Sequence, residues 1–223
     1  MSEKASLSET PRPRLYLNTP FLFEPAPFAE ALARALEAGD VACVRLRLRG
    51  ASEDELRYAV EALKPVCHER DVALILADAF RLAAEMGLDG VHFEEGKNAQ
   101  IEARAALGPE AIIGVGCGAS RDRGLTAGER GASYVAFGPV AQEESLRVGD
   151  LAEPDLFAWW QTMIELPVVA EGGMTPALAA ELTGKADFIA ACRSVWDAPE
   201  GPAAAVAAYQ AAIDEAAAAD ELS

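Results

Sequence analysis

The sequence lacks any apolar run of about 18 residues, has few basic side chains and contains only two histidines. Without such a run, no transmembrane helix is expected. Nineteen Lys and Arg residues against 36 Asp and Glu residues give a formal net charge of −17. A surface this acidic repels nucleic-acid backbones and anionic lipid headgroups, so we expect neither a nucleic acid nor a membrane as a partner.

Cysteine is also scarce, and the four copies are far apart in the chain: Cys43, Cys67, Cys117 and Cys192. They form no Cys-x-x-Cys pair, which argues against a structural zinc site or a disulfide framework and is typical of reduced thiols. Residues 1–13 are polar and contain no apolar segment, which predicts a flexible leader and no signal peptide. These features together predict a cytoplasmic protein.

The chain has 223 residues, 51% of them hydrophobic, and this is enough to build one large domain. Short apolar runs bounded by Gly, Asp or Pro alternate with amphipathic stretches. The expected strands are 15–17, 41–46, 72–76, 90–93, 112–115, 134–137, 167–170 and 187–191. The expected helices are 28–37, 52–70, 80–86, 98–107, 154–165, 176–182 and 202–217. Segment 120–130 is a weak helix prediction, because Gly124 and Gly128 each cost a helix about 1 kcal/mol.

Eight strands that alternate with helices predict an α/β fold, a single compact (βα)8 TIM barrel over residues 14–217. Residues 218–223 are expected to form an acidic tail. Catalytic and binding side chains of such barrels come from the C-terminal ends of the strands and from the loops that follow them.

Three arginines alternate with apolar residues along the second expected strand: Arg45, Arg47 and Arg49. Because the apolar face must pack against the helices, the arginines are predicted to point into the mouth of the barrel. A buried guanidinium needs an anionic partner. That partner is either a phosphate or diphosphate ligand, or an acidic residue at a strand end. The candidates of the second kind are Asp78, Glu94, Glu95, Glu143 and Glu171.

A glycine pair follows the seventh expected strand, and it leads directly to a helix start at Thr175 and Pro176. The backbone N–H groups of Gly172, Gly173 and the helix start suit a phosphate. Arg193 and Ser194 after the eighth strand would complete the site, since barrels often bind phosphate with the loops after strands seven and eight. The alternative is that the glycines only make a tight turn. We expect a small phosphorylated molecule as the partner.

Several motifs, in order and at matching spacing, are similar to those of a known family. They are Leu15-Tyr16-Leu17, Met86-Gly87-Leu88-Asp89-Gly90-Val91-His92, Gly131 to Val140 and Pro167 to Pro176. The chain from Leu15 to about Tyr209 resembles the thiamine phosphate synthase family, which includes the TenI-like thiazole tautomerases. The resemblance implies a barrel that joins an aminopyrimidine diphosphate to a thiazole phosphate in thiamine biosynthesis and releases diphosphate with Mg²⁺.

Carried over residue by residue, the resemblance assigns Arg47 and Arg49 to the diphosphate and Asp78 to Mg²⁺, with Glu94 or Glu95 as a second metal carboxylate. It assigns the substrates to Arg45, Gly172, Gly173, Arg193 and Ser194. The chain departs from the family at several positions. Arg45 and Arg49 replace Gln and Lys, Ala77 replaces Asn, and Lys97 replaces a metal carboxylate. Glu143-Glu144-Ser145-Leu146 stands where the family has Thr-x-Thr-Lys, and Glu171 replaces a small or apolar residue.

These departures predict weak or absent turnover. Two alternatives stay open: a non-catalytic paralogue that binds a phosphorylated ligand, and a metal-free, phosphate-dependent isomerase. His92 is expected inside the barrel. The adjacent Trp159 and Trp160 are expected to pack on the barrel or at a subunit contact, so a homo-oligomer is also open.

Overall fold

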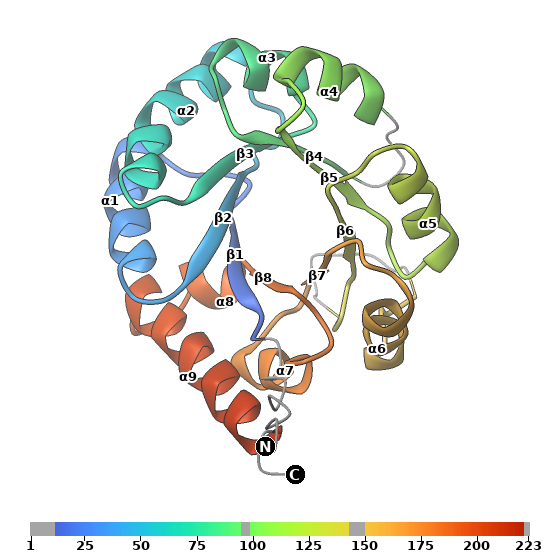
Figure 1. The fold of residues 1–223 in the computed structure, drawn as a ribbon. Helices are drawn as coiled ribbons and strands as arrows, with labels where there is room; N and C mark the ends of the chain where they lie inside the picture. The colour runs from blue at the N-terminus through green and yellow to red at the C-terminus, as the bar shows by residue number, and fades with distance from the viewer. Residues whose placement is uncertain (1–11, 95–98, 143–149, 221–223) are drawn as a thin grey trace, which may run out of the picture.

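Eight parallel strands close into a barrel in sequence order, with helices around it, in a computed structural model that describes residues 12–94, 99–142 and 150–220 (Figure 1). The strands are β1 (Arg14–Asn18), β2 (Val41–Leu46), β3 (Ala73–Ala77), β4 (Gly90–Phe93), β5 (Ile112–Gly116), β6 (Tyr134–Phe137), β7 (Val168–Glu171) and β8 (Phe188–Ala191). β8 pairs with β1 at Leu15 and Ile189, which closes the sheet. The predicted single (βα)8 barrel is therefore confirmed.

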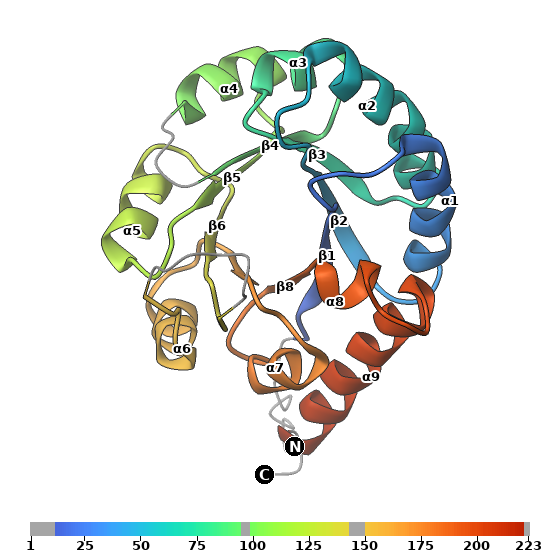
Figure 2. The same ribbon diagram turned by 180° about the vertical axis from the view of Figure 1, so that it is seen from behind.

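The helices surround the strands and cover their outer face (Figure 2). They are α1 (Pro25–Leu36), α2 (Glu53–His68), α3 (Phe80–Glu85), α4 (Gln100–Leu107), α5 (Arg121–Glu129), α6 (Pro154–Met163), α7 (Pro176–Glu181), α8 (Arg193–Trp196) and α9 (Pro202–Asp220). Of the helices in the described ranges, none is long and apolar enough to cross a membrane.

Side chains of each strand alternate between the barrel interior and the helix layer. On β2, Val44 and Leu46 belong to the core between strands and helices, while Cys43 belongs to a small apolar cluster inside the barrel. Tyr16 and Val169 are also members of that interior cluster. Toward the C-terminal ends of the strands the interior becomes polar, and the site begins there.

Helix α5 forms in segment 120–130, where Gly124 and Gly128 made the helix prediction weak. Ser120 caps it, since the Ser120 hydroxyl accepts a hydrogen bond from the Arg123 N–H. Gly124 is buried, and a Cβ at this position would lie 2.6 Å from Trp160 Cη2 and 2.9 Å from Phe137 Cζ. Close packing against these rings therefore requires a glycine that local helix propensity disfavours.

The ends of the chain also differ from the prediction. α9 continues to Asp220, so the first three residues of the expected tail, 218–220, belong to the last helix. The four-residue helix α8 was not predicted. Residues 1–11 and 221–223, which make up most of the expected leader and the rest of the tail, lie outside the described part of the chain.

Replacing Gly124 with Ala is expected to lower the free energy of unfolding by about 1 kcal/mol. Alanine favours the helix, but its Cβ would press on the buried ring of Trp160. Urea denaturation measures the change. In the matched control Gly128→Ala, the new Cβ would lie 3.2 Å from the flexible end of Leu166, so the free energy should stay unchanged or rise. Equal stability of the two variants would contradict the packing explanation.

Candidate functional site

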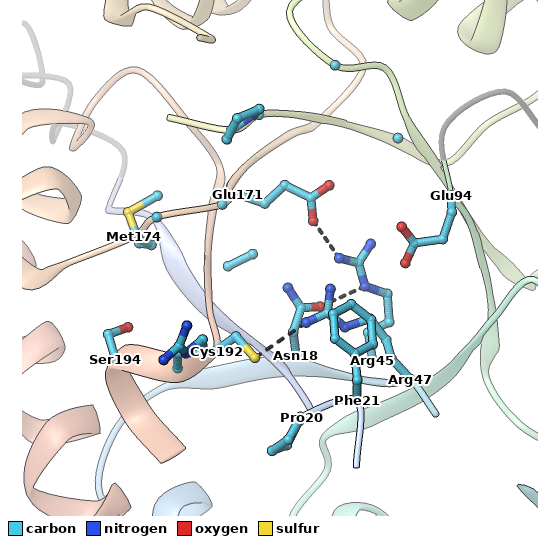
Figure 3. Close-up of a pocket in the computed structure, with 18 of the residues that line it drawn as sticks. Asn18, Pro20, Phe21, Arg45, Arg47, Glu94, Glu171, Met174, Cys192 and Ser194 are labelled. Carbon is cyan, nitrogen blue, oxygen red and sulfur yellow. Dashed lines mark hydrogen bonds and ion pairs between the residues drawn. The ribbon is translucent and has the colours of Figure 1, made fainter. Parts of the chain in front are cut away.

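A cavity of about 820 Å³ opens at the C-terminal ends of the strands (Figure 3). The arginines that line it are Arg45, Arg47, Arg49, Arg123 and Arg193. The carboxylates that line it, among the described residues, are Glu94, Asp150, Glu171 and Asp197. The lining is thus close to charge balance in a chain whose net charge is −17, so positive charge is concentrated at this cavity.

Arg45 lies at the cavity with only 1% of its side chain exposed. Its Nε donates to Asn18 Oδ1 at 2.7 Å, and its Nη2 donates to Glu171 Oε2 at 2.5 Å. Burial by itself lowers the pKa of this guanidinium, but nearby groups, with Glu171 first and then Tyr16 and Glu94, together outweigh burial and the pKa is raised. The sequence left two kinds of anionic partner open for Arg45, a phosphate ligand or an acidic residue at a strand end. In the structure Arg45 is paired with an acidic residue, Glu171.

Arg47 and Arg49 have different surroundings. Both guanidinium groups stack on the Phe21 ring, each at 4.4 Å from its centroid. Arg47 Nη2 also donates to Cys192 Sγ at 3.3 Å, and its buried Nε has no hydrogen-bond partner. Within the described residues neither guanidinium forms an ion pair, so both remain available to an anion in the cavity.

The glycine turn after β7 also lines the cavity, with φ values of +82° at Gly172 and +72° at Gly173. The carbonyl of Gly172 accepts hydrogen bonds from the N–H groups of Val140 and Ala141. A Cβ on Gly173 would lie 2.5 Å from the Ala141 carbonyl oxygen. The glycines are therefore required by the tight turn itself, and they also bring backbone to the cavity surface.

Arg193 and Ser194 begin the short helix α8, which follows the neighbouring strand β8 and also lines the cavity. The Ser194 hydroxyl hydrogen-bonds to Tyr209 at 2.7 Å, and Tyr209 in turn donates to the Met174 carbonyl at 2.7 Å. Since the Tyr209 proton goes to Met174, Ser194 must donate its own proton to Tyr209. The hydroxyl of Ser194 thus links α8 to α9 and to the turn after β7, so its proton is not available to a ligand.

The expected metal residues are brought together only in part. Asp78 ends the β3 region at φ +61°, and its Oδ1 accepts a hydrogen bond from the Glu94 N–H at 3.0 Å. Glu94 lines the cavity, whereas Asp78 is not among the lining side chains. Within the described residues no group of three His, Cys, Asp or Glu side chains could hold a metal ion. Other residues of this prediction lie outside the described ranges: Glu95, Lys97, Glu143 and Glu144.

Magnesium in phosphate-binding sites is held by one or two carboxylates together with waters and substrate phosphates. Asp78 and Glu94, on neighbouring strand ends and joined by a hydrogen bond, supply carboxylates of this kind. Of these two only Glu94 lines the cavity, so a magnesium site that a phosphorylated substrate completes stays a prediction.

His92 lies inside the barrel, as expected, at the end of a hydrogen-bonded chain. Its Nδ1 is 2.8 Å from the Tyr134 hydroxyl, which is 2.9 Å from the Tyr16 hydroxyl. Burial, and then the nearby Arg45 and Arg47, hold the pKa of His92 well below its usual value, so the ring is neutral at pH 7. Burial also raises the pKa of the Cys117 thiol to about 12, which argues against a nucleophilic cysteine there.

Sequence reasoning missed Asn18 and Phe21 as residues of the site. Asn18 is a buried polar residue at the C-terminal end of β1. The Phe21 ring contacts the guanidinium groups of two arginines. Asn18 could have been found from the sequence, because it lies two residues after Tyr16 at the C-terminal end of the first strand and therefore shares its inward direction. Phe21 follows the strand in a loop, where no periodicity indicates the direction of a side chain.

The comparisons with known proteins agree with one another. A family model described as "Thiamine monophosphate synthase" matches residues 15–195. The chain is 49% identical over 197 residues to a protein of Rhodospirillum centenum named "Thiamine-phosphate synthase", covering 88% of this chain and 95% of that protein. A protein of Hyphomonas neptunium with the same name is 41% identical over 213 residues, covering 92% of this chain and 95% of that protein.

A solved structure described as thiamine phosphate pyrophosphorylase from Pyrococcus furiosus superimposes with a TM-score of 0.79. The match covers 92% of this chain and 98% of that one at 24% identity, so it supports the fold alone. The match to the family model over most of the barrel, together with relatives at 41% and 49% identity, decides the family. This chain belongs to the thiamine monophosphate synthase family.

Proposed function

We propose that the chain is a thiamine phosphate synthase, which joins an aminopyrimidine diphosphate to a thiazole phosphate and releases diphosphate. The observation that carries the proposal is the position of Arg45, Arg47 and Arg49, on and after β2, and of the Gly172–Gly173 turn around one cavity. Two anionic substrates need such a concentration of donors in a chain of net charge −17. The names of the relatives support the same activity.

The diphosphate is assigned to Arg47 and Arg49. Stacking on Phe21 holds both guanidinium planes before a ligand arrives, which reduces the entropy lost on binding. Arg47 keeps an unused buried donor at Nε, and a phosphate oxygen would satisfy it. As the bond to the leaving diphosphate breaks, negative charge grows on the departing oxygen, where donors held in place are most effective.

The thiazole phosphate is assigned to the backbone of Gly172, Gly173 and Ser194, with Arg193 at the rim. Short loops tied by hydrogen bonds present these N–H groups, so little reorganisation is needed on binding. Asp78 and Glu94 would hold Mg²⁺, which when bound would neutralise charge on the diphosphate.

We further propose that the protein works in the cytoplasm on small phosphorylated molecules. None of the four cysteines, all of which lie in the described ranges, forms a disulfide, as expected of a reducing compartment. Self-association stays a prediction.

A coupled assay with both substrates and excess Mg²⁺ should give a turnover below about 1 s⁻¹, the low end for ordinary enzymes. The reason is that other departures from the family pattern fall at positions assigned to the diphosphate and the metal, among them Arg49, Ala77 and Lys97. Arg47→Gln should reduce the rate by about a hundredfold. The matched variant Arg34→Gln, on the exposed face of α1, should leave it unchanged.

Turnover at or above about 1 s⁻¹ would show that the departures from the family pattern are compensated. No turnover together with intact phosphate binding would favour the alternative of a non-catalytic binding paralogue. An equal loss of rate in Arg47→Gln and Arg34→Gln would remove Arg47 from the site.

Gly173→Asp is expected to abolish binding of inorganic phosphate in calorimetry, because a carboxylate would face the anion. Gly173→Ala is the matched control, since both variants share the strain at φ +72° and the contact with Ala141. Alanine should weaken binding and aspartate should remove it. Circular dichroism checks that both variants fold. Wild-type affinity in Gly173→Asp would count against the phosphate site.

A further inference from the structure

One buried ion pair, Arg45 with Glu171, lies directly beside the turn that is assigned to phosphate. Glu171 is the last residue of β7, and Gly172 follows it. Its side chain is 21% exposed and lines the cavity, whereas that of Arg45 is 1% exposed. A carboxylate in this position would repel any phosphate bound at the turn, because the cavity screens charge less than open solvent does.

Arg45 removes this repulsion, and its own position is closely fixed. Asn18 binds its Nε, Glu171 binds its Nη2, and the Tyr16 ring lies below its guanidinium at 5.6 Å. In Figure 3 the Glu171 side chain extends from the end of β7 toward Arg45, and Glu94 lies on the other side of the guanidinium. The carboxylate of Glu171 is thus directed at Arg45.

The pair is also reciprocal. A guanidinium with 1% exposure is strongly destabilising without a counterion, so Glu171 allows Arg45 to be buried in the charged form. Arg45 in turn neutralises the negative charge that Glu171 brings to the cavity wall. Removal of Arg45 leaves the Glu171 carboxylate unpaired, and removal of Glu171 takes away the ion-pair partner of Arg45.

We propose that Arg45 and Glu171 are positioning residues that act as one neutral unit and keep the Gly172–Gly173 turn able to accept phosphate. This inference rests on the phosphate site of the proposed function. Arg45 acts on the ligand through Glu171, so its loss should matter only while the carboxylate is present. A direct contact between Arg45 and the phosphate would predict the opposite, a loss that is the same with or without Glu171.

The test is a double-mutant cycle with Arg45→Gln, Glu171→Gln and the double variant, in which calorimetry measures the dissociation constant of inorganic phosphate. Arg45→Gln should raise that constant about tenfold or more, because Glu171 is left unpaired. Glu171→Gln should bind phosphate at least as tightly as the wild type, while its thermal midpoint falls. The double variant should return to within about threefold of the wild-type constant.

Two further variants separate charge from structure. Arg45→Lys keeps the charge but cannot reproduce the two directed bonds to Asn18 and Glu171, so it should retain phosphate affinity at a lower thermal midpoint. Arg14→Gln breaks the exposed pair with Asp40 at the start of β1 and should change neither quantity measurably. If Arg45→Gln does not fold but the double variant does, the result supports Arg45 and Glu171 as one neutral unit. If neither variant folds, the proposal is overturned.

Wild-type affinity in Arg45→Gln, or equal losses in Arg45→Gln and the double variant, would overturn the inference while leaving the phosphate site intact. A wild-type chain that binds no phosphate would overturn the site itself, and this inference with it. The readout does not depend on turnover, so a chain that binds phosphate without catalysis still decides the question.

Discussion

Side chains on a strand of a closed barrel must point either into the barrel or toward the helices, and this two-residue alternation determines which strand residues reach the site. On β2, Val44 and Leu46 pack in the helix-facing core, which directs Arg45 and Arg47 inward. The same rule turns Asn18, His92 and Glu171 toward the interior from three other strands. Closure of the barrel then brings these polar side chains together, although they are up to 153 residues apart in the chain. Of these five polar side chains, Asn18, Arg45, Arg47 and Glu171 line the cavity, and three of those four are charged.

Most of the barrel could be predicted from sequence, because strand periodicity and turn residues are local signals. The bounds of β2, β4 and β6 match the prediction at both ends. Other features depend on contacts between distant elements. α5 forms because Gly124 packs against the Trp160 ring, and packing outweighs the weak helix propensity of the segment. The role of Ser194 could not be predicted from the sequence either, because its hydroxyl is hydrogen-bonded to Tyr209 on another helix.

The departures from the family pattern take on a different meaning once their positions are known. Arg45 and Glu171 are two of them, and counted separately each suggests a lost function. In the structure they are each other's partner, at 2.5 Å, so they are one coordinated change and not two independent losses. The argument for weak turnover therefore depends on the remaining departures, and several of those, including Lys97 and Glu144, lie outside the described residues.

The charge of −17 and an anionic substrate are compatible because the two act over different distances. At physiological ionic strength, exposed charges are screened over about 8 Å, so the acidic surface mainly slows the approach of an anion. Within the cavity the screening is weaker, and a few fixed groups decide affinity. Arg47 and Arg49 act there as available cations, while Arg45 serves to cancel Glu171. Without its partner Arg45, the Glu171 carboxylate at the cavity would thus oppose phosphate binding more strongly than many carboxylates on the outer surface.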